Sequence, residues 1–368
     1  MTKILTVIGA RPQFVKAATV SRAIRNTESA NISEVIVHTG QHYDEMMSKV
    51  FFEELDIPTP DYNLGISDLS HGAMTGRMLE AIESVIVRET PDWVLIYGDT
   101  NSTLAGALAA VKLHVPVAHV EAGLRSFNTR MPEEVNRILT DCISSVLFCP
   151  TLTAVRNLEN EGITKGVHNV GDVMYDAVLH YGTKAKYLNK VTRQFGLQEH
   201  EFVLATCHRQ ENTDNPENIT EIIIALSKIA AELPVVFPMH PRTRNRLSNL
   251  GLEKILKKLH ITEPISYLET IGLEKNARLI VTDSGGIQKE AFFFGVPCIT
   301  VRNETEWVET VACGWNYLVE PKAERIMTAY KVQKDFNTNI NRTGFYGDGR
   351  AAEKILANMK SWLNEGFK

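Results

Sequence analysis

Short runs of apolar residues alternate along the chain with longer stretches in which apolar positions recur every three or four residues. The short runs, such as Trp93–Gly98, are rich in Val, Ile and Leu and predict buried strands, whereas the longer stretches predict helices. Strands that alternate with helices are typical of a parallel sheet covered by helices on both faces. The pattern therefore predicts an α/β protein.

The alternation runs through the chain twice. In the first half the predicted strands are Ile4–Gly9, Glu34–His38, Trp93–Gly98, Val117–Val120, Ser145–Cys149 and Gly166–Val170, and the predicted helices are Gln13–Arg25, Gly72–Arg88, Ser102–Leu113, Glu133–Cys142 and Leu152–Glu159. The pattern restarts with strands at Phe202–Thr206, Val235–Pro238, Ile265–Tyr267, Leu279–Thr282, Cys298–Val301 and Tyr317–Val319, and with helices such as Pro216–Glu232 and Gly286–Phe294. We predict two doubly wound, Rossmann-like domains, residues 1–171 and 172–349, followed by an amphipathic helix in residues 350–368.

Composition agrees with this organisation and excludes several classes of function. A length of 368 residues suits about two domains, and 44% hydrophobic with 23% charged residues is typical of a soluble globular protein. A net charge of −5 without a basic block argues against nucleic acid, and no apolar run reaches the roughly 18 residues of a membrane helix. The five cysteines are scattered without a C-x-x-C pair. We therefore expect a cytoplasmic protein without structural zinc.

The segment Asp283-Ser284-Gly285-Gly286 lies between a predicted strand and a predicted helix. Unpaired backbone N–H groups and the positive end of the helix dipole make such a turn an anion site, which glycine lets a phosphate approach. Glu290, about one and a half turns into the helix, could accept both hydroxyls of a ribose. The alternatives are an ordinary tight turn and a solvated or salt-bridged glutamate.

Ionisable side chains also follow the predicted strands of the first half. Arg11 and Lys16 follow the first strand and could clamp a pyrophosphate, although isolated surface cations are the commoner case. Asp99 could be a helix N-cap or a functional acid. Glu121 ends a strand among small apolar neighbours, where a glutamate needs a partner or a chemical role. Beyond Pro132, the helix dipole fully explains one of Glu133 and Glu134.

In the second half, His208 and His240 each follow a strand and precede cations, Arg242 among them. Two equivalent placements favour a function over a purely structural histidine, because ligands of doubly wound sheets bind beyond the carboxyl ends of the strands. The chain has neither G-x-G-x-x-G after its first strand nor a P-loop motif, which argues against nicotinamide and P-loop chemistry. The histidines have no closely spaced carboxylate or Cys ligands, so no catalytic metal is required.

Together these motifs identify a family. The chain resembles the non-hydrolysing UDP-N-acetylglucosamine 2-epimerases over nearly its whole length, through Gly9-Ala10-Arg11-Pro12 with Lys16, Gly98-Asp99-Thr100, His119-Val120-Glu121-Ala122-Gly123-Leu124-Arg125, Pro132-Glu133-Glu134, His208-Arg209 with Glu211-Asn212, and Asp283-Ser284-Gly285-Gly286 with Glu290. The resemblance implies two domains of the glycosyltransferase B type with the ligand in the interdomain cleft, UDP held mainly by the second domain, and a C-terminal helix that packs back on the first.

The resemblance also implies a reaction and the residues that perform it. Such enzymes invert C2 of UDP-N-acetylglucosamine to give UDP-N-acetylmannosamine, by eliminating UDP to a 2-acetamidoglucal and adding it back, and they use neither metal nor NAD. Carried over, the catalytic residues are Asp99, Glu121, Glu133, His208 and Lys16. The substrate and UDP site comprises Arg11, Arg137, His240, Arg242, Tyr267, Ser284, Gly285, Gly286 and Glu290. We expect a homodimer whose product feeds surface polysaccharide synthesis.

Two departures from the family pattern bear on the substrate. The loop Ala122–Pro132 is shorter than in enzymes that act on plain UDP-N-acetylglucosamine, and Gln13 stands where Glu is frequent. The chain also resembles the branch that epimerises UDP-2,3-diacetamido-2,3-dideoxy-glucuronate, whose carboxylate would need a cation such as Arg125, Arg130 or Arg244. The remaining alternatives are a glycosyltransferase, for which the sequence shows no acceptor or membrane patch, and a silent nucleotide-sugar binder, which leaves the three acids without a role.

Overall fold

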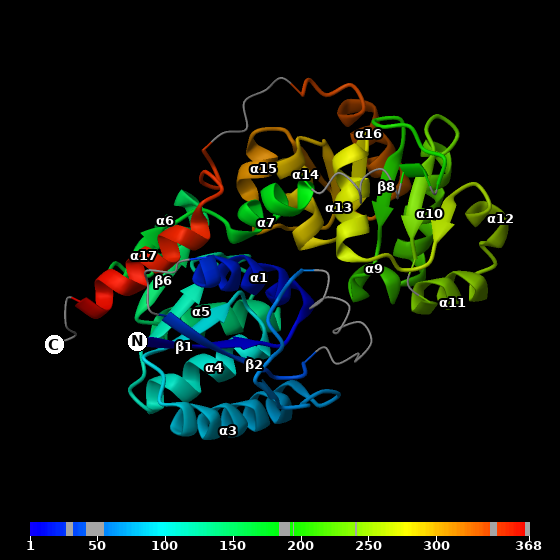
Figure 1. Ribbon diagram of the computed structural model, residues 1–368. Coiled ribbons are helices and arrows are strands. Elements are labelled where there is room, and N and C mark those ends of the chain that lie inside the picture. The colour runs from blue at the N-terminus through cyan, green and yellow to red at the C-terminus, as the bar shows by residue number, and fades with distance from the viewer. Residues whose placement is uncertain are drawn as a thin grey trace. The chain divides into compact units, whose positions relative to one another are not determined.

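The computed structural model describes residues 1–26, 32–41, 55–183, 192–193, 195–239, 241–338 and 344–364. The chain forms two compact units (Figure 1). Unit 1 consists of Met1–Ala177 and Thr343–Lys368, and unit 2 of Val178–Arg342. Each unit contains a parallel sheet with helices packed on it, which confirms the predicted α/β class.

Unit 1 is built on a parallel sheet whose strands run in the order β3-β2-β1-β4-β5-β6-β7. The first strand lies inside the sheet and the chain winds outward from it in both directions, as in a doubly wound fold. The strands are β1 (Thr2–Ile8), β2 (Ile32–His38), β3 (Tyr62–Asn63), β4 (Trp93–Tyr97), β5 (Val117–Val120), β6 (Val146–Cys149) and β7 (Val167–Asn169). The helices are α1 (Arg11–Asn26), α3 (His71–Glu89), α4 (Asn101–Lys112), α5 (Pro132–Ile143), α6 (Leu152–Asn160), α7 (Val173–Gly182, which continues into unit 2) and α17 (Ala351–Asn364).

Small residues on α4 allow this helix to approach the sheet closely. A methyl group on Gly106 would lie 3.2 Å from Cγ2 of Ile96 and 3.4 Å from Val7. Helices α3 and α4 pack together with β1 and β4 in one buried apolar cluster. The strands β4 and β5 are buried along their whole length, as their uninterrupted apolar sequences predicted.

The C-terminal helix α17 completes unit 1 by packing on α1. The rings of Trp93 and Trp362 lie 4.4 Å apart between centroids, and Ile355 of α17 is fully buried. Asp176 accepts hydrogen bonds from the backbone N–H groups of Ala351 (3.1 Å) and Ala352 (2.9 Å) at the first turn of α17. These contacts assign residues 172–177 to unit 1, whereas the predicted division fell at residue 171.

Unit 2 is a second doubly wound sheet, in the order β10-β9-β8-β11-β12-β13. The strands are β8 (Val203–Thr206), β9 (Val235–Pro238), β10 (His260–Thr262), β11 (Leu279–Thr282), β12 (Cys298–Val301) and β13 (Asn316–Val319). The helices are α9 (Gln210–Thr213), α10 (Pro216–Ile229), α11 (Pro241–Asn249), α12 (Glu253–Leu256), α13 (Tyr267–Asn276), α14 (Gly285–Phe294), α15 (Val308–Ala312) and α16 (Ala323–Gln333).

One predicted strand of unit 2 is wrong. Residues Ile265–Tyr267 do not form a strand, because Ser266 caps helix α13, which begins at Tyr267. The Ser266 hydroxyl accepts the N–H of Glu269 at 3.3 Å, and the Glu269 carboxylate accepts the N–H of Ser266 at 3.0 Å. This reciprocal capping box outweighs the strand preference of Ile and Tyr. The edge strand β10 lies instead at His260–Thr262.

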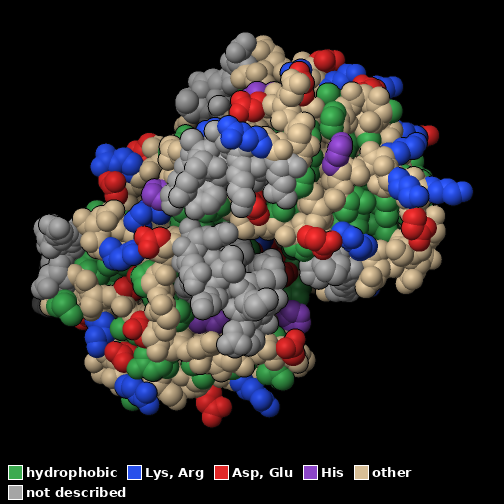
Figure 2. All heavy atoms as spheres, turned by 45° about the vertical axis from the view of Figure 1, so that its right-hand side comes forward, with side chains coloured by type: hydrophobic (Ala, Val, Ile, Leu, Met, Phe, Trp, Pro, Cys, Tyr) green, Lys and Arg blue, Asp and Glu red, His purple; other side chains and the backbone are tan. Residues whose placement is uncertain are grey.

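The surface shown in Figure 2 carries Lys and Arg side chains interspersed with Asp and Glu. In the part of the chain that the structure describes, no helix is both long enough and apolar enough to span a membrane.

Candidate active site

Three strands of unit 1 bring the predicted acids and Lys16 to one edge of the sheet. Strands β1, β4 and β5 are neighbours and run parallel, so the loops after them leave from the same edge. Asp99 follows β4, Glu121 follows β5, and Lys16 lies on α1, which follows β1. Asp99, Glu121 and Lys16 therefore follow neighbouring strands at the same edge of the sheet.

Lys16 and Glu121 form a buried ion pair. Nζ of Lys16 lies 2.6 Å from Oε1 of Glu121, and each side chain is 9% exposed. Glu121 has a backbone φ of 74°, in the left-handed region that glutamate rarely adopts. The pair lies over Gly98, where a methyl group would stand 3.2 Å from Nζ of Lys16. The site thus combines a fixed carboxylate, a fixed ammonium and a strained backbone, which is a recurrent combination at functional sites.

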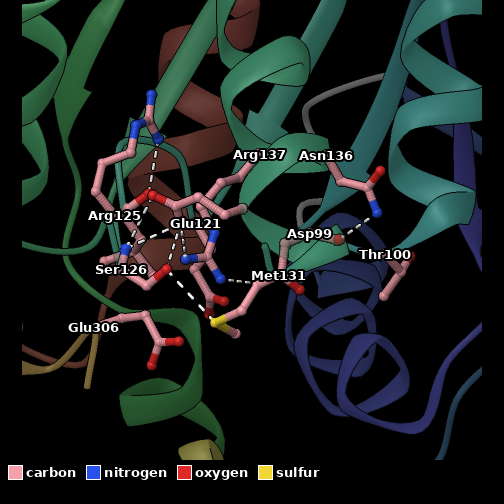
Figure 3. Close-up of polar contacts among 12 residues, drawn as sticks. Asp99, Thr100, Glu121, Arg125, Ser126, Met131, Asn136, Arg137 and Glu306 are labelled. Atoms are coloured by element: carbon pink, nitrogen blue, oxygen red, sulfur yellow. Dashed lines mark hydrogen bonds and ion pairs between the residues drawn. The ribbon is translucent and has the colours of Figure 1, made fainter. Parts of the chain in front are cut away.

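Asp99 is held by helix α5. Arg137 forms an ion pair with Asp99 (Figure 3) and another, at 2.6 Å, with Glu134. Asn136, the preceding residue, donates from Nδ2 to the backbone oxygen of Asp99 at 2.9 Å. The side chain of Arg137 is 5% exposed but that of Asp99 is 31% exposed, so Asp99 keeps access to solvent. A cation beside a half-exposed carboxylate can hold a negatively charged ligand group as well as the acid.

The two acids at the start of α5 have different environments. Glu134 is buried and accepts hydrogen bonds from the backbone N–H of Ser126 (2.9 Å), the Ser126 hydroxyl (2.9 Å) and the backbone N–H of Phe127 (2.8 Å). Glu133 is exposed, and its side chain forms no hydrogen bond or ion pair with another described residue. Glu134 is therefore the structural acid of the pair, and Glu133 is the one available to a ligand.

Behind the acids lies a chain of buried charged groups. His119 contacts Oδ1 of Asp141 through Nδ1 (2.8 Å) and the backbone oxygen of Gly98 through Nε2 (2.8 Å), both of which are hydrogen-bond acceptors. Burial alone would raise the pKa of Asp141, but hydrogen bonds and charges from His119 and Arg125 hold it below its ordinary value. The network joins Gly98, before Asp99, to the segment after Glu121, and so it fixes both acids.

Arg125 belongs to this network, so the prediction that it binds a substrate carboxylate is wrong. Its side chain is 1% exposed and pairs with Asp141 at 2.7 Å and with both carboxylate oxygens of Glu161 at 2.7 and 2.6 Å. A guanidinium so occupied is a structural cation and is not available to a substrate carboxylate. Of the other two candidates, Arg244 pairs with the exposed Glu263 at 2.8 Å, and Arg130 is exposed.

In unit 2, Asp283 organises the predicted phosphate turn. Its carboxylate accepts the backbone N–H groups of His208 (3.1 Å) and Arg209 (3.0 Å) and the Nδ2 of Asn212 (3.1 Å). These bonds join the loop after β8 to the loop after β11, since the two strands are neighbours. The His208 ring lies 3.6 Å from the carboxylate and its side chain is 54% exposed, so the imidazole remains open to a ligand.

The turn itself opens helix α14. Ser284 is the N-cap, and its hydroxyl oxygen accepts the N–H of Ile287 at 3.3 Å. A hydroxyl that accepts can still donate its own proton, so the serine can serve both the helix and a phosphate. Gly285 and Gly286 form the first turn, and a methyl group on Gly286 would lie 3.9 Å from Oε2 of Glu290. The glutamate thus reaches back toward the glycine turn.

Glu290 lies among buried polar groups. It is 4% exposed, and its Oε1 accepts the hydroxyl of Tyr267 at 2.8 Å. Tyr267, the first residue of α13, was expected in the UDP site and reaches this site through Glu290. Burial, followed by the negative charge of Glu290, raises the pKa of Tyr267 well above its ordinary value. The tyrosine therefore stays protonated and continues to donate.

Three expected site residues lie outside what the structure describes: His240 as a whole, and the side chains of Arg11 and Arg242. Gln13 proves to be structural, because it accepts the N–H groups of Gly9 (2.8 Å) and Ala10 (2.9 Å) and donates to the backbone oxygen of Tyr97 (2.8 Å). Sequence reasoning missed Asn136, which holds Asp99. Its position one residue before Arg137 carries no signal of its own.

Among the described residues, no group of three or more His, Cys, Asp or Glu side chains is placed to hold a metal ion. The polar groups at both sheet edges are instead paired carboxylates, cations and backbone N–H groups. Such an arrangement is suited to proton transfer in unit 1 and to binding an anionic, hydroxyl-bearing ligand in unit 2.

Comparisons with known proteins identify the family. A sequence profile described as UDP-N-acetylglucosamine 2-epimerase matches residues 23–360. A Pseudomonas aeruginosa protein named UDP-2,3-diacetamido-2,3-dideoxy-D-glucuronate 2-epimerase is 54% identical over 359 residues, covering 96% of this chain and 98% of that protein. A Methanococcus maripaludis UDP-N-acetylglucosamine 2-epimerase is 44% identical over 372 residues, covering 98% of each. The crystal structure of the Methanocaldococcus jannaschii UDP-GlcNAc 2-epimerase in complex with UDP-GlcNAc and UDP has a TM-score of 0.88 at 44% identity, over 99% of this chain and 100% of that one.

The fold and these similarities define a nucleotide-sugar epimerase, which is an isomerase. The chain belongs to the UDP-N-acetylglucosamine 2-epimerase family. The predicted pair of Rossmann-like domains of the glycosyltransferase B type is confirmed by the same structure.

Proposed function

We propose that the chain inverts C2 of a UDP-2-acetamido sugar by eliminating UDP and adding it back. The observation that carries the proposal is the buried Lys16–Glu121 ion pair, whose carboxylate sits on a strained backbone beside the half-exposed Asp99. A base that removes a weakly acidic C–H proton must be ionised and fixed in place, and an ion pair inside the protein provides both. Such an arrangement is hard to explain by stability alone, because a buried ion pair contributes little to it.

The proposed reaction begins with loss of one proton from C2 and of UDP from C1. A carboxylate takes the C2 proton, the C–H electron pair forms the C1–C2 double bond, and the C1–O bond breaks so that UDP leaves with its electron pair. The product is a 2-acetamidoglucal. Return of a proton to the opposite face of C2 and readdition of UDP to C1 give the epimer. Two acids on opposite faces are needed, and Asp99, Glu121 and Glu133 are the candidates, with Lys16 and His208 assisting departure of the diphosphate.

In this proposal, unit 2 binds UDP. Ser284, Gly285 and Gly286 would hold phosphate oxygens at the N-terminus of α14, and Glu290 would accept the ribose hydroxyls. Arg137 of unit 1 would contribute a positive charge, and Arg11, His240 and Arg242 remain proposed ligands of the UDP-sugar. The two units thus divide the work between chemistry and binding, and the product would supply polysaccharide synthesis.

Identity to two named relatives supports an order of preference between the two proposed substrates. The chain is 54% identical to a protein named for UDP-2,3-diacetamido-2,3-dideoxy-D-glucuronate and 44% identical to one named for UDP-N-acetylglucosamine. We therefore place the 3-acetamido uronate first and UDP-N-acetylglucosamine second. Arg125 is already paired with Asp141 and Glu161. We therefore propose that Arg130, which is exposed, binds the uronate carboxylate.

The deciding experiment is proton NMR of the purified protein with each UDP-sugar in D2O, without an acceptor. Elimination and readdition require that the C2 hydrogen exchange with solvent, so the manno product should carry deuterium at C2. Prolonged incubation should release traces of UDP and the glycal. Product that keeps its C2 hydrogen would reject the elimination route and the roles of the three acids. The faster of the two substrates identifies the one this chain uses.

A further inference from the structure

A buried acid next to Glu290 has no place in the function described so far. Glu274 lies on α13, seven residues after Tyr267, so the two side chains project from the same face of that helix two turns apart. Helix α13 packs against α14, which carries Glu290. Tyr267 contacts Glu290 directly, at 2.8 Å from hydroxyl to Oε1. Glu274 and Tyr267 therefore face the same carboxylate from one helix.

The surroundings of Glu274 offer nothing to balance a negative charge. Its side chain is fully buried, and no N–H group or hydroxyl of the described residues donates to either of its oxygens. The polar group that Glu274 faces is another carboxyl, that of Glu290. No lysine, arginine or histidine in the described part of the chain forms an ion pair with it. An isolated carboxylate in such a place would be costly, and a buried acid of this kind becomes neutral instead.

The electrostatics of the pair point the same way. Burial, then the negative charge of Glu290 and a hydrogen bond between the two carboxyl groups, raise the pKa of Glu274 well above its ordinary value. Glu290 accepts the tyrosine hydroxyl, and a hydrogen bond to a carboxylate favours its charged form. When two carboxyls share a site, the proton belongs on the one with fewer donors. Here that one is Glu274.

We infer that Glu274 is a neutral carboxylic acid that donates its proton to Glu290 and, together with Tyr267, fixes the orientation of that carboxylate for ribose recognition. This inference rests on the proposed function, because it takes Glu290 as the ribose acceptor. Glu274 is then a positioning residue, which acts through Glu290 without touching the nucleotide. A protonated acid kept neutral by an apolar site is a known hydrogen-bond donor in enzymes.

The inference makes a distinction between two substitutions. Glu274→Gln retains a group that can donate, so the orientation of Glu290 should survive. Glu274→Leu fills similar space but removes the donor, so Glu290 loses the hydrogen bond that we infer from Glu274. A residue that merely filled the core would tolerate leucine at least as well as glutamine, because replacing a buried polar group by an apolar one of similar size is often stabilising.

The test compares UDP with 2′,3′-dideoxyuridine 5′-diphosphate, which lacks both ribose hydroxyls, by titration calorimetry. The wild-type protein should prefer UDP by about tenfold or more, as expected for hydrogen bonds to a charged acceptor. Glu274→Gln should keep this preference, and Glu274→Leu should lose most of it, approaching Glu290→Gln. Glu253→Gln, at an exposed position of the same unit, serves as a control and should behave as wild type.

Each outcome is decisive. Full preference in Glu274→Leu, or loss of preference in Glu274→Gln, would overturn the inference while leaving the proposed function intact. A wild-type protein that does not distinguish the two nucleotides would instead reject Glu290 as the ribose acceptor, and the inference would fall with it. If Glu274→Leu does not fold, infrared spectroscopy of the wild type and Glu274→Gln decides the protonation state. The wild type should show a protonated carboxyl C=O band at neutral pH that Glu274→Gln lacks, and its absence would also overturn the inference.

Discussion

Glu121 combines an unfavourable backbone with a favourable side-chain contact. A left-handed conformation costs a residue other than glycine roughly 1–2 kcal/mol. The N–H groups of Glu121 and Ala122 both donate to the backbone oxygen of Phe148 at 3.1 Å, and Lys16 holds the carboxylate. The surrounding structure therefore compensates a local strain whose effect is to aim one carboxylate beside Asp99.

We expect Glu121→Gln and Asp99→Asn to lose turnover by roughly 100- to 10,000-fold, because each change removes a proton acceptor and retains the shape of the side chain. UDP affinity should change by no more than about twofold, since we propose that unit 2 holds the nucleotide. Steady-state NMR assays and calorimetry measure the two effects. Glu80→Gln, on the exposed face of α3, is the matched control. Normal turnover in both site variants would remove these acids from the reaction.

Helix α5 presents two adjacent glutamates that differ in burial, and the difference makes a prediction. Glu133→Gln should reduce turnover without loss of stability, because the side chain is exposed. Glu134→Gln should destabilise unit 1 by about 1–3 kcal/mol, because its carboxylate accepts several hydrogen bonds including one from Arg137. Urea unfolding and turnover assays on both variants separate the effects. The reverse assignment would follow if Glu134→Gln were stable but inactive.

Asp176 of α7, which accepts hydrogen bonds from the first turn of α17, should make the stability of unit 1 depend on pH. Burial raises the pKa of Asp176 from 3.8 to about 6. The folded protein thus holds this proton more tightly than the unfolded chain does, so the contribution to stability is largest below about pH 4 and falls as the pH rises toward 6. The difference between a pKa of 3.8 and one of about 6 corresponds to about 3 kcal/mol.

Asp176→Asn should remove that dependence. Between pH 4 and pH 7 the variant should gain about 3 kcal/mol relative to the wild type, measured by urea unfolding followed by circular dichroism. Asp68→Asn, an exposed position of the same unit, should leave the pH profile unchanged. A difference between wild type and Asp176→Asn that does not vary with pH would show that the carboxyl titrates alike in both states.

At the level of elements, the sequence predicts most of the fold, because buried parallel strands have uninterrupted apolar runs. The strands Val117–Val120, Val235–Pro238, Leu279–Thr282 and Cys298–Val301 were predicted with their observed bounds. The predicted strand at Ile265–Tyr267 failed although the sequence contains the Ser266 and Glu269 capping signal. Strand preference alone takes no account of such a capping box, which decides the structure of this segment.

The sequence predicts at which edge of the sheet the candidate site lies, but it does not predict which side chains form ion pairs there. Parallel strands bring Asp99 and Glu121 to one edge whatever the details of packing. That Lys16 meets Glu121 across 105 positions depends on how α1 is rotated over the sheet, which a single sequence does not report. The same holds for Glu274, since a lone acid on a helix of weak periodicity gives no sign that it faces Glu290.

For the whole molecule, the division of work between the units predicts a pattern of hydrogen exchange. UDP alone should protect the amides of residues 283–290 in unit 2, which form the phosphate turn. The intact UDP-sugar, bound to Glu121→Gln so that it is not turned over, should extend protection to the strand ends of unit 1 near Asp99. Glu290→Ala should weaken the first effect. Protection by UDP at Asp99 with none at residues 283–290 would reverse the assignment of the units.

The position of α17 has a consequence for how the protein is made. Unit 2 is encoded between the two segments of unit 1, so it emerges from the ribosome whole while unit 1 still lacks the helix that covers α1 and Trp93. Translation at roughly 5–20 residues per second leaves unit 1 incomplete for at least about a second after unit 2 has been synthesised. Unit 2 can therefore finish folding first, and the apolar surface under α17 is what nascent-chain chaperones would meet.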